Sequence, residues 1–174
     1  MKKKCGNCCS NFGKIITNTE TYTDMHIRWS LKSFDALTPQ ELYSIVHLRN
    51  EVFVVEQHCV FQDADHKDQE RFHLMGLNNE GKLIAYCRIV PPGVSYKEPS
   101  IGRVVSDASV RRKGAGKQLM QEAIRHCIHL HGNQTIRIGA QLYLKAFYES
   151  LGFQQSSEMY LEDGIEHIEM CYTP

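Results

Sequence analysis

The segment Val110-Arg111-Arg112-Lys113-Gly114-Ala115-Gly116-Lys117 combines residue types that favour the binding of an anion. Its two glycines let the backbone approach a ligand closely, because no Cβ stands in the way. The segment lies between an expected strand and the clearest helical pattern of the chain, where the unpaired N–H groups of a first helical turn attract phosphate. Four basic side chains reinforce this field: Arg111, Arg112, Lys113 and Lys117. The pattern predicts a phosphate-binding loop, with a solvated basic turn as the alternative.

The loop fits neither of the common nucleotide signatures. The P-loop pattern G-x-x-x-x-G-K-S/T is absent, and the loop does not match the G-x-G-x-x-G pattern of dinucleotide-binding folds. A nucleotide site of either kind is therefore not predicted.

Several side chains could act as bases, and one tyrosine has a position of two meanings. Tyr148 lies on an apolar helical stripe, a position that by itself favours a core tyrosine whose hydroxyl is hydrogen-bonded. Glu56 follows the apolar run 52–55, so we expect either a partly buried carboxyl with a raised pKa or a structural glutamate. The other candidate bases are Glu51 and two histidines that also suit solvated or core positions, His73 and His167.

Clusters of acidic, histidine and cysteine residues could suggest further sites. Three aspartates of one loop could steer a cationic acceptor or simply be solvated, and their spacing does not match a calcium loop: Asp63, Asp65 and Asp68. Three histidines near a helix C-terminus suit the negative end of the helix dipole: His126, His129 and His131. The cluster Cys5-x-x-Cys8-Cys9 supplies only part of the ligand set of a zinc site. We therefore predict no bound metal.

Composition limits the class of protein. The chain has 174 residues, 42 % of them apolar, which suits one soluble domain with a substantial core. Twenty basic and twenty acidic residues cancel, so charge gives no general argument for nucleic acid or a membrane as partner. No apolar run approaches the roughly 20 residues that span a bilayer. Seven cysteines, an odd number, do not suggest a disulfide framework, so we expect a cytosolic protein.

Periodicity predicts one domain over residues 25–174, preceded by a polar tail of residues 1–24 that shows neither helical nor strand period. Helices are expected at 38–53, which opens with a capping pattern, at 116–130, which Gly132 closes, and at 143–151. Strands are expected at 26–31, 72–77, 82–90, 100–106, 135–141, 153–161 and 166–172. Strand–helix alternation implies a parallel pair and the hairpins imply antiparallel ones, so we predict one mixed α/β sheet with helices on its faces.

Two motifs, in this order and at this spacing, resemble those of the GNAT superfamily of N-acetyltransferases. The stretch R-R-K-G-A-G after the strand 101–105 is similar to the acetyl-CoA signature of that superfamily. Residues 141–153, Q-L-Y-L-K-A-F-Y-E-S-L-G-F, resemble its second motif, which ends Y-E-x-x-G-F. The segments 48–57 and 161–168 also resemble one branch, the ElaA-like proteins. The likeness covers about residues 25–174.

The resemblance implies a fold, a cofactor and site residues. The implied GNAT fold is an α/β (α+β) fold with one mixed, mostly antiparallel sheet, a splayed central parallel strand pair and flanking helices. The pantetheine of acetyl-CoA would lie against the backbone of Val104, Val105 and Ser106. Its pyrophosphate would lie on N–H groups of Arg112, Lys113, Gly114, Ala115, Gly116 and Lys117. Tyr148 takes the place of the tyrosine that protonates the leaving thiolate. Gln141 stands where the family often has asparagine, so a longer amide would have to reach the cofactor.

The resemblance also implies the reaction, which is direct transfer of an acetyl group from acetyl-CoA to a primary amine of a small molecule or peptide. A lysine-like amine is neutral in only roughly one molecule in a few thousand at pH 7, so a base such as Glu56 or His167, a water relay or a desolvating pocket is needed. The alternative is a non-catalytic module that senses acyl-CoA. A generic nucleotide-binding protein ranks below both. Dimers are common in the family, which allows a homodimer.

Overall fold

The structure is a computed structural model and describes residues 26–174. In this part of the chain eight strands form one sheet in the order β1-β2-β3-β4-β5-β8-β6, and β7 pairs with β8. The strands are β1 (Arg28–Ser33), β2 (Phe72–Leu77), β3 (Leu83–Val90), β4 (Ser100–Ser106), β5 (Ile136–Gln141), β6 (Gln154–Gln155), β7 (Tyr160–Glu162) and β8 (Ile165–Tyr172). All neighbours are antiparallel except β4 and β5. The predicted mixed, mostly antiparallel sheet with a central parallel pair is confirmed.

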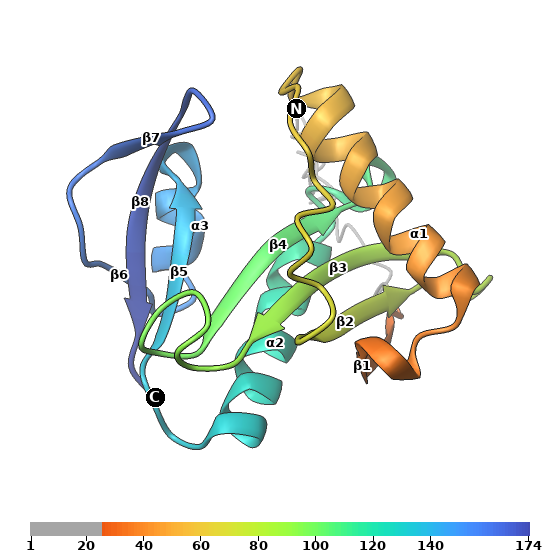
Figure 1. Ribbon diagram of the computed structural model, residues 1–174, viewed down its shortest axis with the longest axis horizontal. Coiled ribbons are helices and arrows are strands. Elements are labelled where there is room, and N and C mark those ends of the chain that lie inside the picture. The colour runs from red at the N-terminus through yellow and green to blue at the C-terminus, as the bar shows by residue number, and fades with distance from the viewer. Residues whose placement is uncertain (1–25) are drawn as a thin grey trace, which may run out of the picture.

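Helices cover both faces of the sheet. They are α1 (Pro39–Arg49), a π-helical continuation of it (Asn50–Glu56), α2 (Ala115–His131), α3 (Lys145–Glu149) and short 3₁₀ segments at Phe34–Ala36, Ala108–Val110 and Leu142–Leu144. Ile45 of α1 packs in one core cluster with Tyr86 of β3, whereas Leu119 of α2 packs in another with Ala85 and Cys87. Successive strand residues point to opposite faces, so α1 and α2 lie on opposite sides of the sheet (Figure 1).

Helix α1 begins as the sequence predicts. The Thr38 hydroxyl accepts a hydrogen bond from the Glu41 N–H (3.2 Å), and the Glu41 carboxylate accepts one from the Thr38 N–H (2.9 Å). Beyond Arg49 the α-helix widens into π turns. The helix expected over 38–53 is confirmed, and its change from α to π form is a feature that the spacing of apolar residues does not reveal.

Helix α2 confirms the clearest helical pattern of the sequence. Its buried face includes Leu119, Ala123 and Cys127, spaced one turn apart. Gly132 ends it with φ 80° and donates its N–H to the Ile128 carbonyl at 2.8 Å. This long, well-packed helix gives the predicted phosphate loop a fixed support at its N-terminus.

Strands β4 and β5 separate immediately after they meet. Their pairing consists of Ser100 with Arg137, and beyond this point the two ribbons diverge into a V (Figure 1). Strand β4 also carries a bulge, since Arg103 and Val104 together lie opposite Cys87, and Arg103 has φ 49°. In the described structure, the β5-facing edge of β4 therefore has no ladder partner after Ser100. The splayed parallel pair is confirmed.

The structure changes one expected strand, at 153–161, and does not reach the expected domain boundary at residue 25. The single strand expected at 153–161 is divided into β6 and β7. In the segment between these two strands, the Ser156 N–H donates to the Glu169 carbonyl and the Ser157 hydroxyl accepts from the Glu169 N–H, which interrupts the regular pairing. The tail and its cysteine cluster lie outside the described residues, so the domain boundary at residue 25 stays a prediction. Over residues 26–174, no helix is both long and apolar enough to cross a membrane.

Candidate active site

The predicted phosphate loop leads into the N-terminus of α2. Gly114 occupies the N-cap with φ 89°, and no side chain caps the helix. The first helical bond runs from the Gln118 N–H to the Gly114 carbonyl (3.1 Å), so the preceding N–H groups lie before the helical ladder. Arg112, Lys113 and Lys117 are exposed around them. A Cβ atom placed on Gly114 would have no heavy atom within 4 Å, so there is open space for a ligand beside this part of the backbone. These features fit a diphosphate.

Arg111 connects this loop to β4 and to the end of the π-helix. Its Nε donates to the Ser106 carbonyl (3.2 Å), and its Nη2 donates to Glu56 Oε2 (2.8 Å). Glu56 is 46 % exposed, and the hydrogen bond from Arg111 lowers its pKa. The expectation of a partly buried carboxyl with a raised pKa is therefore wrong, since the ion pair favours the charged form.

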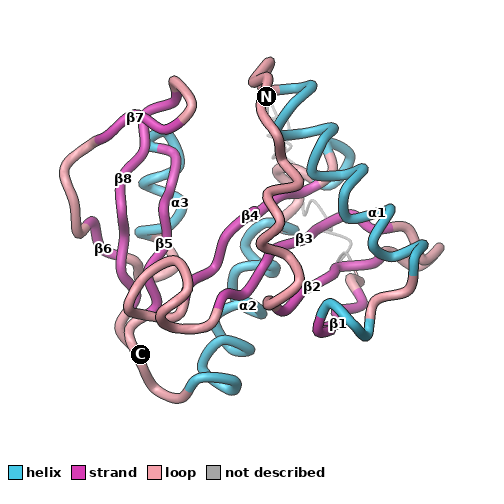
Figure 2. Tube along the Cα trace, viewed as in Figure 1, coloured by secondary structure: helices cyan, strands magenta, loops and turns pink. Residues whose placement is uncertain are grey.

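One cavity of about 610 Å³ lies on the α1 side of the sheet and reaches into the V between β4 and β5. Figure 2 shows the two long loops that border it, which follow the π-helix and β3. Four of the predicted catalytic and cofactor-binding residues line this cavity together: Val104, Gln141, Tyr148 and His167. Gln141 donates to the Gln57 side chain (3.3 Å), which bridges β5 to the segment that follows the π-helix. The loop residues 111–117 do not line the cavity, and neither do Val105 and Ser106 of β4. Arg111 ties the loop to the end of β4 through the Ser106 carbonyl.

Tyr148 reaches the cavity from α3. Its ring packs edge-on against Phe147 and Phe153, and the residue is only 5 % exposed. Burial raises its pKa above the usual range. Tyr148 belongs to the hydrophobic core, as one interpretation expected, but among the described residues no hydrogen bond to its hydroxyl is formed. The geometry suits a group that keeps its proton until a strong base forms beside it.

His167 reaches the same cavity from β8. Its Nδ1 lies 2.9 Å from the Ile165 carbonyl, an arrangement in which Nδ1 carries the proton and donates it. The lone pair of a neutral ring is then on Nε2. The Tyr160 ring stacks on the imidazole at 5.9 Å between centroids. This tautomer is suited to accepting a proton.

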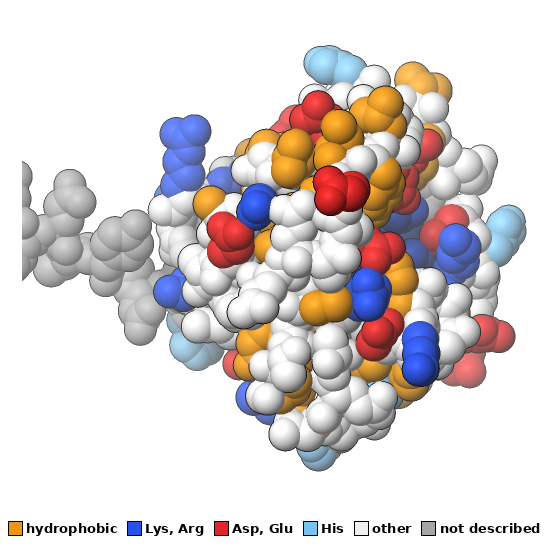
Figure 3. All heavy atoms as spheres, turned by 90° about the vertical axis from the view of Figure 1, so that its left-hand side faces the viewer, with side chains coloured by type: hydrophobic (Ala, Val, Ile, Leu, Met, Phe, Trp, Pro, Cys, Tyr) orange, Lys and Arg blue, Asp and Glu red, His pale blue; other side chains and the backbone are white. Residues whose placement is uncertain are grey.

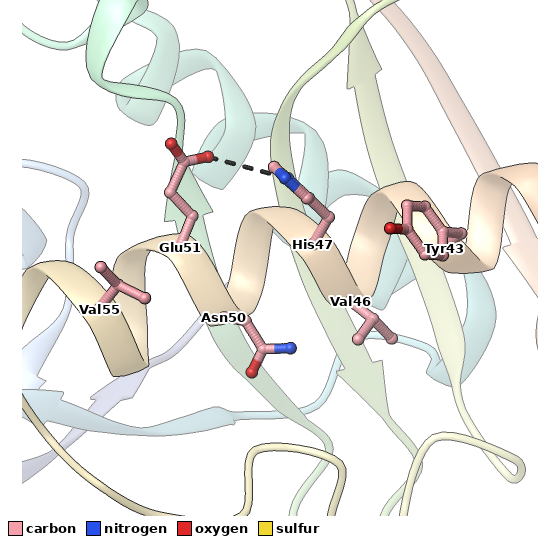
Figure 4. A pocket seen from close by; sticks show the side chains of 6 residues that line it. All are labelled: Tyr43, Val46, His47, Asn50, Glu51 and Val55. Carbon is pink, nitrogen blue, oxygen red and sulfur yellow. Dashed lines mark ion pairs between the residues drawn. The ribbon is translucent and has the colours of Figure 1, made fainter.

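The two other candidate bases lie elsewhere. His73 is fully buried, accepts from the Tyr86 hydroxyl (2.9 Å) and donates to the Asp68 carbonyl (3.1 Å), and burial lowers its pKa. Glu51 faces a separate hollow of about 390 Å³ on the outer side of α1, where it lies 3.9 Å from His47 (Figure 4). All residues that line this hollow come from α1 and its π-helical continuation. Neither Glu51 nor His73 lines the larger cavity.

The aspartates of the loop after the π-helix are not solvated, in contrast to one expectation. Asp63 and Asp68 are buried and both pair with Arg49, which is 1 % exposed. Asp65 accepts two hydrogen bonds from Arg88 (3.0 and 3.1 Å). Burial alone would raise its pKa, but the Arg88 hydrogen bond and charge outweigh burial and lower the pKa to about 2. The aspartates serve as partners of arginines, and they cannot act as free steering charges.

Sequence reasoning missed the charged side chains of the strands. Arg88 of β3 and Arg103 of β4 line the cavity beside Phe53 and Phe61. The sequence did hold a signal for them, since two arginines lie within largely apolar strand patterns. A buried charge requires a partner, and the three aspartates of the preceding loop could supply one.

On the side of the molecule that carries β6, β7 and β8, basic and acidic side chains are interspersed (Figure 3). Over residues 26–174, no group of three or more metal-ligating side chains gathers.

A family model described as an acetyltransferase (GNAT) domain matches residues 33–174. The protein ElaA of Escherichia coli is 38 % identical over 147 residues, which are 83 % of this chain and 95 % of ElaA. A UPF0039 protein of Synechocystis is 38 % identical over 148 residues, 85 % of this chain and 96 % of the relative.

Solved structures of related proteins have the same fold as this chain. An acyl-CoA N-acyltransferase from Pseudomonas aeruginosa superposes with a TM-score of 0.80 at 39 % identity, covering 85 % of this chain and all of that protein (100 %). The structure of E. coli ElaA gives 0.79 at 36 % identity and covers 84 % of this chain and 99 % of ElaA. The chain belongs to the GNAT acetyltransferase family and, within it, to the ElaA-like branch.

Proposed function

We propose that the protein transfers an acetyl group from acetyl-CoA to a primary amine of a small molecule or peptide. The observation that carries this proposal is the shared cavity, in which Tyr148 and His167 face the gap between β4 and β5. The name of the Pseudomonas relative, an acyl-CoA N-acyltransferase, agrees with an acyl-CoA donor. The odd number of cysteines in the chain suits a reducing compartment, and we place the protein in the cytosol.

The donor side of the site fits coenzyme A. The N–H groups between Gly114 and Gln118 would hold the pyrophosphate, with Lys113 and Lys117 nearby. The unpaired edge of β4 offers backbone groups of Val104, Val105 and Ser106 to the pantetheine arm. When bound, acetyl-CoA supplies the acetyl group as a thioester.

The chain's own residues have three tasks in the transfer. The β4 backbone holds the carbonyl oxygen of the acetyl group and stabilises its developing negative charge. His167 Nε2 takes a proton from the amine as the C–N bond forms. Tyr148 gives its proton to the sulfur as the C–S bond breaks. His167 gains one proton and Tyr148 loses one, so the transfer leaves the total number of protons on the protein unchanged. Exchange with water then returns the proton from His167 Nε2 to the Tyr148 hydroxyl.

His167 is the better placed of the two proposed bases. It lines the cavity with its lone pair on Nε2, whereas Glu56 is held by Arg111 as an ion pair. Glu56 could act only after that pair opens, and its lowered pKa makes it a weak base. We therefore assign the base to His167 and a positioning role on the cofactor loop to Glu56.

A sensor that binds acyl-CoA without turnover is the second candidate. It would need the helix N-terminus but not a phenol and an imidazole in one cavity. The presence of both side chains favours catalysis.

Two measurements test the proposal. Calorimetry with coenzyme A should show saturable binding, and thiol release from acetyl-CoA should rise when a suitable amine is added. Binding without thiol release across a broad amine panel would favour the sensor. No binding at millimolar coenzyme A would refute both candidates.

A further inference from the structure

One wall of the cavity is built around Arg103. The residue lies in the bulge of β4 with φ 49°, a backbone conformation that an arginine rarely adopts. Its guanidinium lies 6.0 Å from the centre of the Phe53 ring and 5.6 Å from that of Phe61. The side chain is 25 % exposed, and the residue lines the cavity. A strained backbone and two ring contacts thus hold a cation in a defined place on the cavity wall.

The contacts of Arg103 leave one edge of its guanidinium available. Nε lies 3.0 Å from Asp63 Oδ1, and Nη2 lies 3.5 Å from Asp65 Oδ2, at the limit of a hydrogen bond. Among residues 26–174 no hydrogen bond from Nη1 is formed. Nη1 and Nη2 together form the edge that binds a carboxylate through two parallel hydrogen bonds.

The neighbouring aspartates do not neutralise this wall completely. Asp63 and Asp68 are shared with Arg49, and Asp65 is bound twice by Arg88. Arg71 adds a further charge, since it is 4 % exposed and within the described chain no carboxylate lies at ion-pair distance from it. Four arginines of the group thus face four carboxylates, the three aspartates and Glu70, whose charge acts on Arg71. The exposed Lys67 lines the cavity as an additional cation. The wall is left with net positive charge.

The opposite wall of the cavity carries negative charge. The turn between β7 and β8 contributes Glu162 and Asp163 to the cavity lining, next to the proposed base His167. A molecule that spans the cavity meets cations at the β4 wall and carboxylates at the β8 wall. This separation of charge favours a ligand with a negative group at one end and an amine at the other.

We infer that the acceptor is an amine that carries a free carboxylate, as an amino acid does, and that Arg103 binds this carboxylate. The amine then lies on the His167 side, where it loses its proton as the new C–N bond forms. The inference rests on the proposed function and adds the chemical class of the acceptor. Arg103 acts as a specificity-determining residue.

The test compares amino acids with the amines obtained by removing their carboxylate, for example phenylalanine with phenethylamine and lysine with cadaverine. Thiol release from acetyl-CoA is measured for every member of such pairs across the common amino acids. We expect kcat/KM to be higher for the carboxylated member of the best pair by about 10- to 100-fold, the range of a hydrogen bond to a charged group. Equal or faster turnover of the decarboxylated amines would overturn the inference while the proposed function stood.

Variants then assign the effect to the residue. Arg103→Gln should reduce the preference for the carboxylated member by about 10- to 100-fold through KM. Arg103→Lys keeps the charge beside Asp63 but loses the paired hydrogen bonds, and it should reduce the preference by a smaller factor. The control is Arg125→Gln, which removes an exposed cation on α2 that pairs with Glu122, and it should keep the preference. An unchanged preference in both Arg103 variants would overturn the assignment. Absence of both coenzyme A binding and thiol release in the wild type would remove the proposed function together with this inference.

Discussion

The hydroxyl of Tyr148 is the single group whose removal should change the chemistry with the least change in structure. Within the described chain it has no hydrogen-bond partner, so Tyr148→Phe leaves no buried group unpaired. We expect kcat to fall about 100-fold, within the range of a lost general acid, with coenzyme A affinity nearly unchanged. Steady-state kinetics and calorimetry check the two parts. Tyr43→Phe is the control, since Tyr43 is 73 % exposed on α1. Unchanged turnover in Tyr148→Phe would refute the assigned role.

His167 should supply the base that the acceptor amine needs near neutral pH. His167→Asn keeps a donor for the Ile165 carbonyl but removes the basic nitrogen. We expect kcat/KM to fall about 100-fold near neutral pH, because the acceptor amine must then lose its proton without help. The deficit should shrink as pH rises and more amine is neutral in solution. The measurement is kcat/KM from pH 6 to 10, and a wild-type profile with no ascending limb would contradict the assignment.

Which residues gather in the candidate site could be predicted where a local motif marked them, and not where a distant partner determines the environment. Tyr148 and His167 were both found from sequence, and the structure places them in one cavity. For Glu56 the alternative of a hydrogen-bonded or exposed glutamate is confirmed, and the partly buried carboxyl with a raised pKa is wrong. Its environment is set by Arg111, 55 residues further along the chain. Arg103 was missed for a similar reason, since a strand pattern does not reveal a bulge.

The N-terminus of α2 is the element on which the proposed binding of coenzyme A depends. Gly114 at its N-cap and Gly132 at its C-cap both have positive φ, and a Cβ at either position meets nothing within 4 Å. Alanine at either should therefore destabilise the fold through backbone strain alone, by about 1–2 kcal/mol. Only Gly114→Ala places a methyl group beside the proposed diphosphate, so only this variant should lose coenzyme A affinity, by roughly tenfold. Urea unfolding and calorimetry of the two variants measure these effects. Equal affinities would show that the diphosphate lies elsewhere.

The sequence predicted most elements because their signals are local. The strands at 72–77 and 100–106 match β2 and β4, and the capping residues of α1 and the glycine after α2 act where expected. The division of β6 from β7 accompanies tertiary contacts that Glu169 makes with the segment between the two strands, and the π turns after α1 have the same apolar spacing as an α-helix. These features could not be inferred from periodicity.

The whole molecule is divided into two halves of a sheet that touch at the base of the V. On the β1–β4 half, a network of arginines and aspartates fixes the loop after the π-helix onto β3 and β4. Contacts such as Gln57 with Gln141 connect this loop to the β5–β8 half. The cavity is therefore formed by side chains that are far apart in sequence, which explains why its polar wall was not foreseen.

Ion pairs of this kind should make the stability of the fold sensitive to acid. Burial tends to raise the pKa of Asp107, but its hydrogen bonds from Lys82 and Ser109 lower the pKa to about 2, as the Arg88 bond does for Asp65. A carboxyl with a depressed folded-state pKa stabilises the fold above its unfolded pKa and loses this contribution as pH falls through its folded pKa. The free energy of unfolding should thus decrease from about pH 4 to pH 2.

Asp107→Asn isolates one such group. The amide can still accept from the Ser109 N–H, as the carboxylate does at 2.8 Å, but it does not titrate. Between about pH 4 and pH 2 the unfolded wild-type chain binds a proton at this site and the folded chain does not, which contributes a slope of up to about 1.4 kcal/mol per pH unit. The variant should therefore be less stable than the wild type near neutral pH, and the difference should narrow as the solution is acidified. Urea unfolding at intervals from pH 2.5 to 6 measures this convergence, and parallel stability curves for the two proteins would show that the Lys82–Asp107 pair does not couple folding to protonation.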